Sequence, residues 1–329
     1  MAVNAIDAVP PQFVPMRVRF GPSAVNVSWC FDDGLPFDEP FFDQSILRGL
    51  RKPFNRAFRP QTSIEGLIEF SRSNACRPPD AFIFHMSRCG STLLAQMFAA
   101  LPDTRVISEA STIERILYAN RAVPGLSPQT HVDWVRAIVL AYGAGGTARY
   151  ARYVVKFDAW HIERLRLIEQ AFPEVPWIFL FRHPLEVLVS NLAQRAASTL
   201  PGTTMHSVPG IDAYTASRLP SEQYLALILA HHMRCALHYQ SNPHGLYIDY
   251  ADLPERALPA IMAHLRWSLT GADMEKMLAR SRCDAKQPAA RFAADGSRKR
   301  DSASPEEREL CQTLLLPPYQ ELLGLCRKS

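Results

Sequence analysis

The sequence predicts an α/β fold: a three-layer sandwich in which helices flank a central parallel sheet, with a small N-terminal extension of hairpin and helix. From residue 81 onward, short apolar segments of strand length alternate with longer segments of helical length. The segment 177–181 (Trp-Ile-Phe-Leu-Phe) is apolar at every position, which is typical of strands covered on both faces. With 47% apolar residues in a length of 329, the chain can build the core of one or two domains.

The first part of the chain lacks this alternation. We therefore divide the chain into an N-terminal extension, residues 1–78, and an α/β domain, residues 79–329. A Gly-Pro-Ser turn between two stretches of alternating apolar and polar residues predicts a hairpin in the extension. Its expected elements are strands at 16–20 and 24–30 and helices at 41–50 and 64–72.

The elements of the α/β domain follow from its apolar strands and from the helical periodicity between them. Strands are expected at 81–86, 105–108, 153–157, 177–181 and 245–250. Helices are expected at 91–101, 112–121, 131–143, 160–171, 221–240 and 306–326. A further helix is expected to begin at Pro184, because proline suits a first helical turn. Ligands of such sheets bind beyond the carboxyl ends of the strands.

Composition narrows the class of protein. The formal net charge of +4, from 36 basic and 32 acidic residues, suits an anionic ligand and is too small to indicate nucleic acid. Seven cysteines without a Cys-x-x-Cys pair argue against a disulfide framework or zinc cluster and for a reducing compartment. The N-terminus does not resemble a signal peptide, and no apolar run reaches the roughly 18 residues of a membrane span. We expect a cytoplasmic protein.

The most informative segment is Arg88-Cys89-Gly90-Ser91-Thr92, between an apolar strand and a helix. A helix N-terminus offers unpaired N–H groups and partial positive charge to a phosphate. The glycine allows close approach, and the arginine and hydroxyl groups add donors. A nucleoside-triphosphate P-loop would need lysine where Ser91 stands. The loop therefore indicates a phosphate site that is not built for a metal-bound triphosphate.

A second anion site is indicated where the strand 177–181 ends. Arg182 follows the strand directly, and Ser190 lies two turns into the next helix. Arginine offers a planar fork of donors to phosphate, and serine adds a hydroxyl. Alone, the pair is equally compatible with a surface arginine and an ordinary helical serine. Beside the 88–92 loop, it indicates a second phosphate.

Together the two sites resemble those of sulfotransferases that use 3′-phosphoadenosine 5′-phosphosulfate (PAPS). In that family an Arg/Lys-Ser-Gly-Ser/Thr-Thr loop holds the 5′-phosphosulfate, and residues 88–92 match it. In the same family, an Arg directly after a strand and a Ser eight residues later bind the 3′-phosphate. Arg182 and Ser190 have this spacing. Residues 247–253 are similar to the family's Tyr-Glu-Asp-Leu segment. The resemblance covers residues 81–255 and implies a P-loop-type fold, PAPS as co-substrate and adenosine 3′,5′-bisphosphate as product.

The resemblance also implies roles for single residues. The backbone N–H groups from Cys89 to Leu93 would bind the 5′-phosphate. The loop is closer to the Arg-type loop of bacterial and tyrosylprotein sulfotransferases, in which a later glutamate is the proposed base; Glu109 takes that position. Lys156 resembles a lysine that contacts the sulfuryl group. Together with Arg88, it would neutralise negative charge on the sulfuryl and bridging oxygens. We therefore expect Arg88, Glu109 and Lys156 to be catalytic, and we expect that no metal is needed.

Some assignments have competitors. His85 and His161 are rival bases, and Glu109 is also compatible with a plain helix-start residue. Cys89 replaces a small hydroxyl residue, and its thiol would be sensitive to oxidation if the local positive charge lowered its pKa.

Related enzymes close a basic C-terminal loop over the 3′-phosphate. Residues 291–300 are basic here, so Arg291 or Arg298 is a candidate for that contact, against the alternative of a solvated loop.

We therefore expect a sulfotransferase that acts on a hydroxyl or amine of a small-molecule acceptor. A P-loop nucleotide or metabolite kinase is the alternative, and it would need the missing Gly-Lys-Ser/Thr. A non-catalytic domain that binds an adenosine bisphosphate is a third reading. The phenylalanine-rich N-terminal region is expected to line the acceptor pocket or to form a homodimer, and no nucleic acid or membrane partner is expected.

Overall fold

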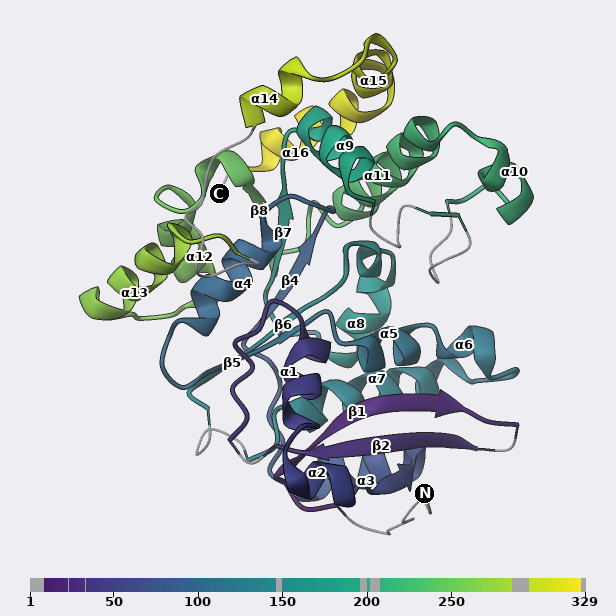
Figure 1. Ribbon diagram of the computed structural model, residues 1–329, viewed down its shortest axis with the longest axis vertical. Helices are drawn as coiled ribbons and strands as arrows, with labels where there is room; N and C mark the ends of the chain where they lie inside the picture. Colours follow the sequence, from purple (N-terminus) through teal and green to yellow (C-terminus); the bar gives the residue numbers. More distant parts are fainter. Residues whose placement is uncertain are drawn as a thin grey trace.

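A five-stranded parallel sheet forms the centre of the molecule, as the computed structural model shows (Figure 1). Its strands are β4 (Ala81–His85), β5 (Thr104–Ser108), β6 (Arg152–Lys156), β7 (Trp177–Phe181) and β8 (Gly245–Asp249). Their order is β5-β6-β4-β7-β8, and every neighbouring pair is parallel. The structure describes residues 9–22, 24–32, 34–145, 150–195, 200–201, 208–285 and 296–326.

The strand order explains where a ligand can bind. From β4 the chain moves to β5 and β6 on one side, and it then crosses to β7 and β8 on the other. Such a reversal beside β4 makes a crevice at the carboxyl ends of the strands. All five residues of β4 and of β7 are buried, because both faces of these apolar strands are covered by helices. The predicted α/β sandwich is confirmed.

Helices cover both faces of the sheet. In Figure 1, α4, α12 and α13 lie on one side of the strands, and α8 and α11 lie on the other. The larger helices are α4 (Ser91–Ala99), α7 (Pro128–Tyr142), α8 (Leu165–Ala171), α9 (Pro184–Ala193), α11 (Ser221–Leu237), α12 (Ala257–Leu265), α13 (Gly271–Ser281) and α16 (Leu316–Cys326). The shorter ones are α5 (Ser111–Leu117), α6 (Ala119–Ala122), η2 (Ala159–Arg164), α10 (Ala213–Arg218), η4 (Tyr250–Asp252), α14 (Gly296–Asp301), α15 (Pro305–Leu310) and η5 (Cys311–Leu315).

Several helices differ from their predicted bounds. Helix α7 begins three residues earlier than expected, because the Ser127 side chain caps it and Pro128 occupies its first turn. The helix expected at 160–171 starts as the 3₁₀ segment η2, and the one expected at 306–326 contains a π segment, η5. Helices α12 and α13 were not predicted. No helix among the described residues is long and apolar enough to cross a membrane.

The N-terminal region forms its own antiparallel sheet. It consists of β1 (Phe13–Phe20), β2 (Val25–Phe31) and β3 (Gln61–Ser63), with helices α1 (Phe42–Gly49), α2 (Pro53–Ala57) and α3 (Ile64–Ser73). The predicted hairpin is β1–β2, which pairs from Phe13↔Phe31 to Phe20↔Val25. Strand β3 was not predicted, since three residues are too few to display an alternating pattern.

A buried ion pair joins this region to the main sheet. Asp32, just after β2, pairs with Arg105 in β5 at 3.1 Å, and both side chains are almost fully buried. The guanidinium of Arg105 also lies over the rings of Phe37 and Tyr150, at 4.4 and 4.8 Å. Buried charges are tolerated when they are paired in this way.

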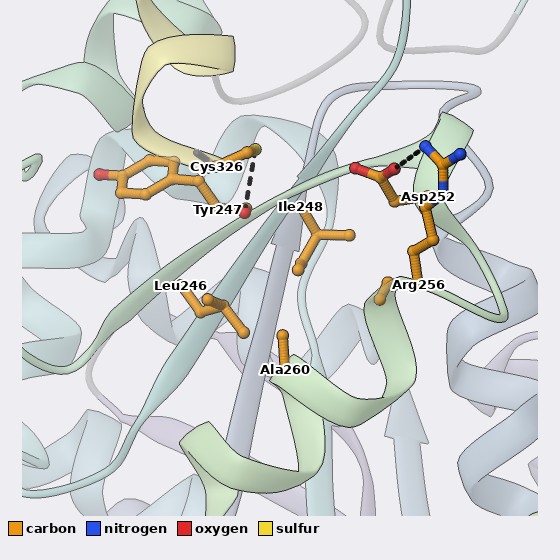
Figure 2. Close-up of a pocket in the computed structure, with 8 residues that line it drawn as sticks. Leu246, Tyr247, Ile248, Asp252, Arg256, Ala260 and Cys326 are labelled. Carbon is orange, nitrogen blue, oxygen red and sulfur yellow. Dashed lines mark hydrogen bonds and ion pairs between the residues drawn. The ribbon is translucent and has the colours of Figure 1, made fainter. Parts of the chain in front are cut away.

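The outer edge of the sheet is partly covered by the end of the chain. Strand β8, helix α12 and Cys326 line a small cavity of about 160 Å³, shown in Figure 2. The Cys326 thiol donates a hydrogen bond to the Tyr247 carbonyl at 3.1 Å. None of the predicted site residues lines this cavity, so the site must be sought at the carboxyl ends of the strands.

Candidate active site

The phosphate-type loop connects β4 to α4 with two residues in the left-handed region. Gly90, directly before α4, has φ +90°, and Arg88 has φ +58°. A Cβ atom on Gly90 would lie 2.4 Å from two ring carbons of Tyr250, so only glycine fits. No side chain caps this end of α4. The first N–H groups of the helix, through Leu93, are therefore arranged as an anion site requires.

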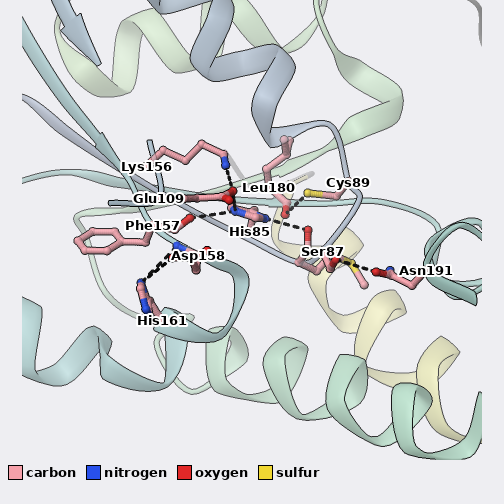
Figure 3. Close-up of polar contacts among 11 residues, drawn as sticks. His85, Ser87, Cys89, Glu109, Lys156, Phe157, Asp158, His161, Leu180 and Asn191 are labelled. Atoms are coloured by element: carbon pink, nitrogen blue, oxygen red, sulfur yellow. Dashed lines mark hydrogen bonds and ion pairs between the residues drawn. The ribbon is translucent and has the colours of Figure 1, made fainter. Parts of the chain in front are cut away.

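The two predicted phosphate motifs meet in space. Arg88 Nε donates a hydrogen bond to Ser190 Oγ in α9 at 3.0 Å. Ser87 Oγ donates to Asn191 Oδ1 at 2.9 Å, as Figure 3 shows. The loop after β4 and the helix after β7 are thus joined side by side, because β4 and β7 are neighbours in the sheet.

Arg182 lies on the same side of the site. Its guanidinium lies over the Tyr250 ring at 4.5 Å, and its Nε and Nη2 atoms both lie 2.6 Å from Glu186 Oε2. Tyr250 thereby contacts Arg182 and stands against Gly90. The sequence analysis singled out the segment 247–253 but assigned no role to Tyr250 or to Glu186. For Tyr250, the Tyr-Ala-Asp-Leu pattern in that segment could have indicated a role.

Glu109 and Lys156, the predicted base and the predicted contact to the sulfuryl group, are in direct contact with each other. Glu109 follows β5 with φ +52°, and its backbone N–H donates to the Lys156 carbonyl at 2.8 Å. Its carboxylate binds Lys156 Nζ and lies 3.5 Å from His85 Nε2 (Figure 3). The ends of β4, β5 and β6 therefore contribute one residue each to a cluster in which His85 and Lys156 are buried and Glu109 is partly exposed.

The electrostatics of this cluster assign charges to its members. Burial alone would raise the pKa of Glu109, but the charge of Lys156 and the contact with His85 hold it below its usual value. Burial, and then Lys156, lower the pKa of His85. These shifts favour the ionised form of the Glu109 carboxyl group and the neutral form of the His85 imidazole. The ring nitrogens of His85 lie 3.0 Å from the Met86 carbonyl and 2.9 Å from the Phe157 carbonyl.

Asp158 is a second carboxyl group at the end of β6. Burial, and then the charge of Glu109, raise its pKa well above the usual value. Its side chain caps η2, and its backbone N–H donates to His161 Nδ1 at 3.2 Å. This contact engages one ring nitrogen of His161, whereas backbone carbonyls lie within hydrogen-bond distance of both ring nitrogens of His85. Two neighbouring carboxyl groups with oppositely shifted pKa values are typical of acid–base sites.

The Cys89 thiol does not behave as a reactive group. It is fully buried and donates to the Leu180 carbonyl at 3.1 Å. Burial raises its pKa to about 12, against the smaller opposing effects of a hydrogen bond from the Ser91 backbone and then of the nearby charges of Lys156 and Arg182. The condition for a thiol sensitive to oxidation, a pKa lowered by the local positive charge, is therefore not met, because desolvation of the thiolate outweighs that charge.

The C-terminal basic segment is described only in part. Arg291 lies outside the described residues, and Arg298 is exposed in α14. Arg300 of the same helix binds Glu186 Oε1. Among the described residues, no group of three His, Cys, Asp or Glu side chains is arranged to hold a metal ion.

A comparison with models of protein families gives the family of this chain. The sequence model of the sulfotransferase family matches residues 79–270. No curated protein matches the chain.

Solved structures with a similar fold include two bacterial proteins and one from mouse. The sulfotransferase domain of the Synechococcus PCC 7002 olefin synthase is 18% identical and covers 73% of this chain and 95% of its own, with a TM-score of 0.43. The sulfotransferase from Alicyclobacillus acidocaldarius is 13% identical and covers 76% of this chain and 96% of its own, with a TM-score of 0.47. Mouse sulfotransferase SULT7A1, complexed with PAP, is 12% identical, with 80% and 93% covered and a TM-score of 0.44. Because the family model spans more than half of the sequence, the chain belongs to the sulfotransferase family and is a transferase.

Proposed function

We propose that this sulfotransferase transfers the sulfuryl group of PAPS to a hydroxyl or amine of a small-molecule acceptor by in-line displacement. The observation that carries the proposal is the hydrogen bond between Arg88 and Ser190. It joins a loop suited to the 5′-phosphosulfate to a helix suited to the 3′-phosphate. A triphosphate would occupy one such site, whereas PAPS carries anionic groups on both sides of its ribose.

The described residues fit this nucleotide. The uncapped start of α4, with N–H groups from Cys89 to Leu93 and the hydroxyls of Ser91 and Thr92, would bind the 5′-phosphate. Arg182 and Ser190 would bind the 3′-phosphate.

Catalysis would then depend on positioning, positive charge and the removal of one proton. In-line transfer spreads negative charge over the peripheral and leaving oxygens, which Arg88 and Lys156 would stabilise. Glu109 would take the acceptor proton, a step worth on the order of 10²–10⁴-fold. While Lys156 binds Glu109, the carboxylate is a weak base. When the ammonium turns toward the developing charge, the pKa of Glu109 rises at the stage when it must accept a proton.

The donor nucleotide can be identified by thermal shift. We expect adenosine 3′,5′-bisphosphate to raise the melting temperature, with a stabilisation of about 2.7 kcal/mol at a hundredfold excess over Kd. ATP with Mg²⁺ should have no comparable effect. Stabilisation by ATP–Mg²⁺ alone would instead support the kinase alternative.

A sulfate-transfer assay with labelled PAPS and a panel of hydroxyl and amine acceptors tests turnover. Binding of the bisphosphate without transfer to any acceptor would favour a non-catalytic nucleotide-binding protein. Transfer that survives both Glu109→Ala and Lys156→Ala would contradict the catalytic roles given above.

We also propose that the protein works in the cytoplasm, that residues 1–78 form an extension to the catalytic part, and that this extension contributes to a homodimer. The last point is supported by Leu47 in α1 and Phe54 in α2, whose side chains are exposed by 60% and 48%. Light scattering of the wild type and of a Leu47→Ser/Phe54→Ser variant tests it. A dimer that is unchanged by both substitutions would contradict this interface.

A further inference from the structure

The carboxylate of Glu186 lies between two arginines that come from distant parts of the chain. Its Oε2 atom lies 2.6 Å from Nε and Nη2 of Arg182, at the end of β7. Its Oε1 atom binds Arg300 in helix α14. Glu186 itself is only 6% exposed. It is therefore a buried anion with one oxygen directed to each cation.

The backbone around Glu186 is adapted to this bridge. Glu186 is the third residue of α9, after Pro184, where the helix dipole favours negative charge. Helix α14 begins at Gly296, and a Cβ atom there would lie 2.8 and 2.9 Å from the two carboxylate oxygens. Glycine thus lets α14 approach the carboxylate closely. The first turn of α9 and the first turn of α14 meet at this one side chain.

The bridge also restricts the orientation of Arg182. The Nε–Nη2 edge of its guanidinium faces Glu186, and its plane lies on the Tyr250 ring at 4.5 Å. An arginine held at one edge and one face can present its remaining donors in only one direction, which is what bidentate recognition of a phosphate requires.

We propose that Glu186 is a positioning residue for the 3′-phosphate of the donor: it orients Arg182 and holds α14 beside the nucleotide site. The inference rests on the proposed function above, because it needs Arg182 to bind that phosphate.

Positioning and charge repulsion by Glu186 predict opposite changes in nucleotide affinity when its charge is removed. A carboxylate beside an anion site repels the ligand, so removal of its charge would tighten nucleotide binding if charge alone mattered. If Glu186 acts by positioning, its removal weakens binding of ligands that carry a 3′-phosphate and leaves other adenine nucleotides unaffected.

The test compares two ligands that differ only in the 3′-phosphate. Calorimetry on the full chain measures Kd for adenosine 3′,5′-bisphosphate and for adenosine 5′-monophosphate. Glu186→Gln, which preserves size and removes charge, should weaken bisphosphate binding at least about tenfold and leave monophosphate binding unchanged. The KM for PAPS should rise by a similar factor, with kcat at saturation within about twofold. Glu174→Gln, in an exposed turn, is the matched control and should change neither affinity.

A second variant keeps the inference testable if Glu186→Gln does not fold. Arg300→Gln leaves Arg182 and Glu186 intact. It should also weaken binding of the bisphosphate and leave binding of the monophosphate unchanged. The double variant should be no weaker than Glu186→Gln alone, because both substitutions break one bridge.

Three results would overturn the inference. The first is unchanged or tighter binding of the bisphosphate by Glu186→Gln. The second is an equal loss of affinity for the bisphosphate and the monophosphate in that variant. The third is an unchanged affinity of Arg300→Gln for the bisphosphate. A wild-type protein without preference for the bisphosphate over the monophosphate would instead overturn the proposed function, and the inference with it.

Discussion

At the scale of single residues, the site is characterised by two neighbouring carboxyl groups whose pKa values are shifted in opposite directions. Glu109 is held as a carboxylate by Lys156, while burial keeps a proton on Asp158 more strongly than usual. These opposite shifts arise within one small region at the carboxyl ends of β5 and β6 (Figure 3). Each shift gives a measurable dependence on pH.

Lys156→Met should move the acidic limb of the pH–rate profile. A base must be ionised, so kcat/KM falls as the pH drops through the pKa of Glu109. Loss of the Lys156 charge removes the main influence that lowers this pKa, and the limb should therefore shift to higher pH. The variant should also lose on the order of 10²-fold in kcat, because positive charge at the transferred group is lost. A limb that stays in place, in a variant that remains folded, would argue against Glu109 as the base.

Asp158→Asn should change the pH dependence of stability. The pKa of Asp158 is raised in the folded protein, so its contribution is fully present below the unfolded pKa of about 3.9. That contribution is lost as the pH rises through the folded value. Asparagine keeps the cap of η2 without the charge. The variant should therefore gain melting temperature relative to wild type between pH 4 and pH 8, as calorimetry at both values would show.

At the scale of elements, the turn from β4 into α4 leaves no room for a side chain at Gly90. Gly90 combines φ +90° with the close approach of the Tyr250 ring. Gly125 has a similar φ of +76°, but nothing lies within 4 Å of the position of its Cβ. The two glycines share a positive φ and differ in their surroundings.

Gly90→Ala should therefore impair both stability and nucleotide binding, whereas Gly125→Ala should affect stability alone. The backbone strain common to both costs roughly 1–2 kcal/mol. The clash in Gly90→Ala additionally displaces Tyr250 or the loop, and we expect bisphosphate affinity to fall by more than about tenfold. Urea unfolding and calorimetry measure the two effects. Equal loss of affinity in both variants would show that the Tyr250 contact is unimportant.

At the scale of the whole molecule, the N-terminal region is joined to the catalytic sheet by a buried ion pair. Asp32 and Arg105 are almost fully buried, whereas Asp38 and Arg48, within the N-terminal region itself, form an exposed pair. A buried charge that loses its partner is strongly destabilising, and an exposed pair contributes little.

Asp32→Ala should lower the free energy of unfolding by about 3–5 kcal/mol, and Asp38→Ala by about 1 kcal/mol or less. Denaturation followed by tryptophan fluorescence and by circular dichroism measures both. If residues 1–78 unfold independently of residues 79–329, Asp32→Ala should separate the transition into two steps. A single shifted transition would indicate that the proposed division does not correspond to separate folding units.

The sequence by itself determined the class of the fold and the family of the protein. An apolar strand such as 177–181 is stable when both of its faces are covered, which is typical of a parallel sheet, and Arg88 to Thr92 belong to one turn. Both features can therefore be recognised in the sequence. Only the tertiary structure decided how the pieces combine. The sheet order brings Arg88 to Ser190 and Glu109 to Lys156, and packing buries Cys89 and raises its pKa. The bridge from Arg182 through Glu186 to Arg300 joins residues more than 110 positions apart. Such contacts, and the desolvation that sets each pKa, depend on which segments become neighbours in space, and local sequence patterns do not encode that.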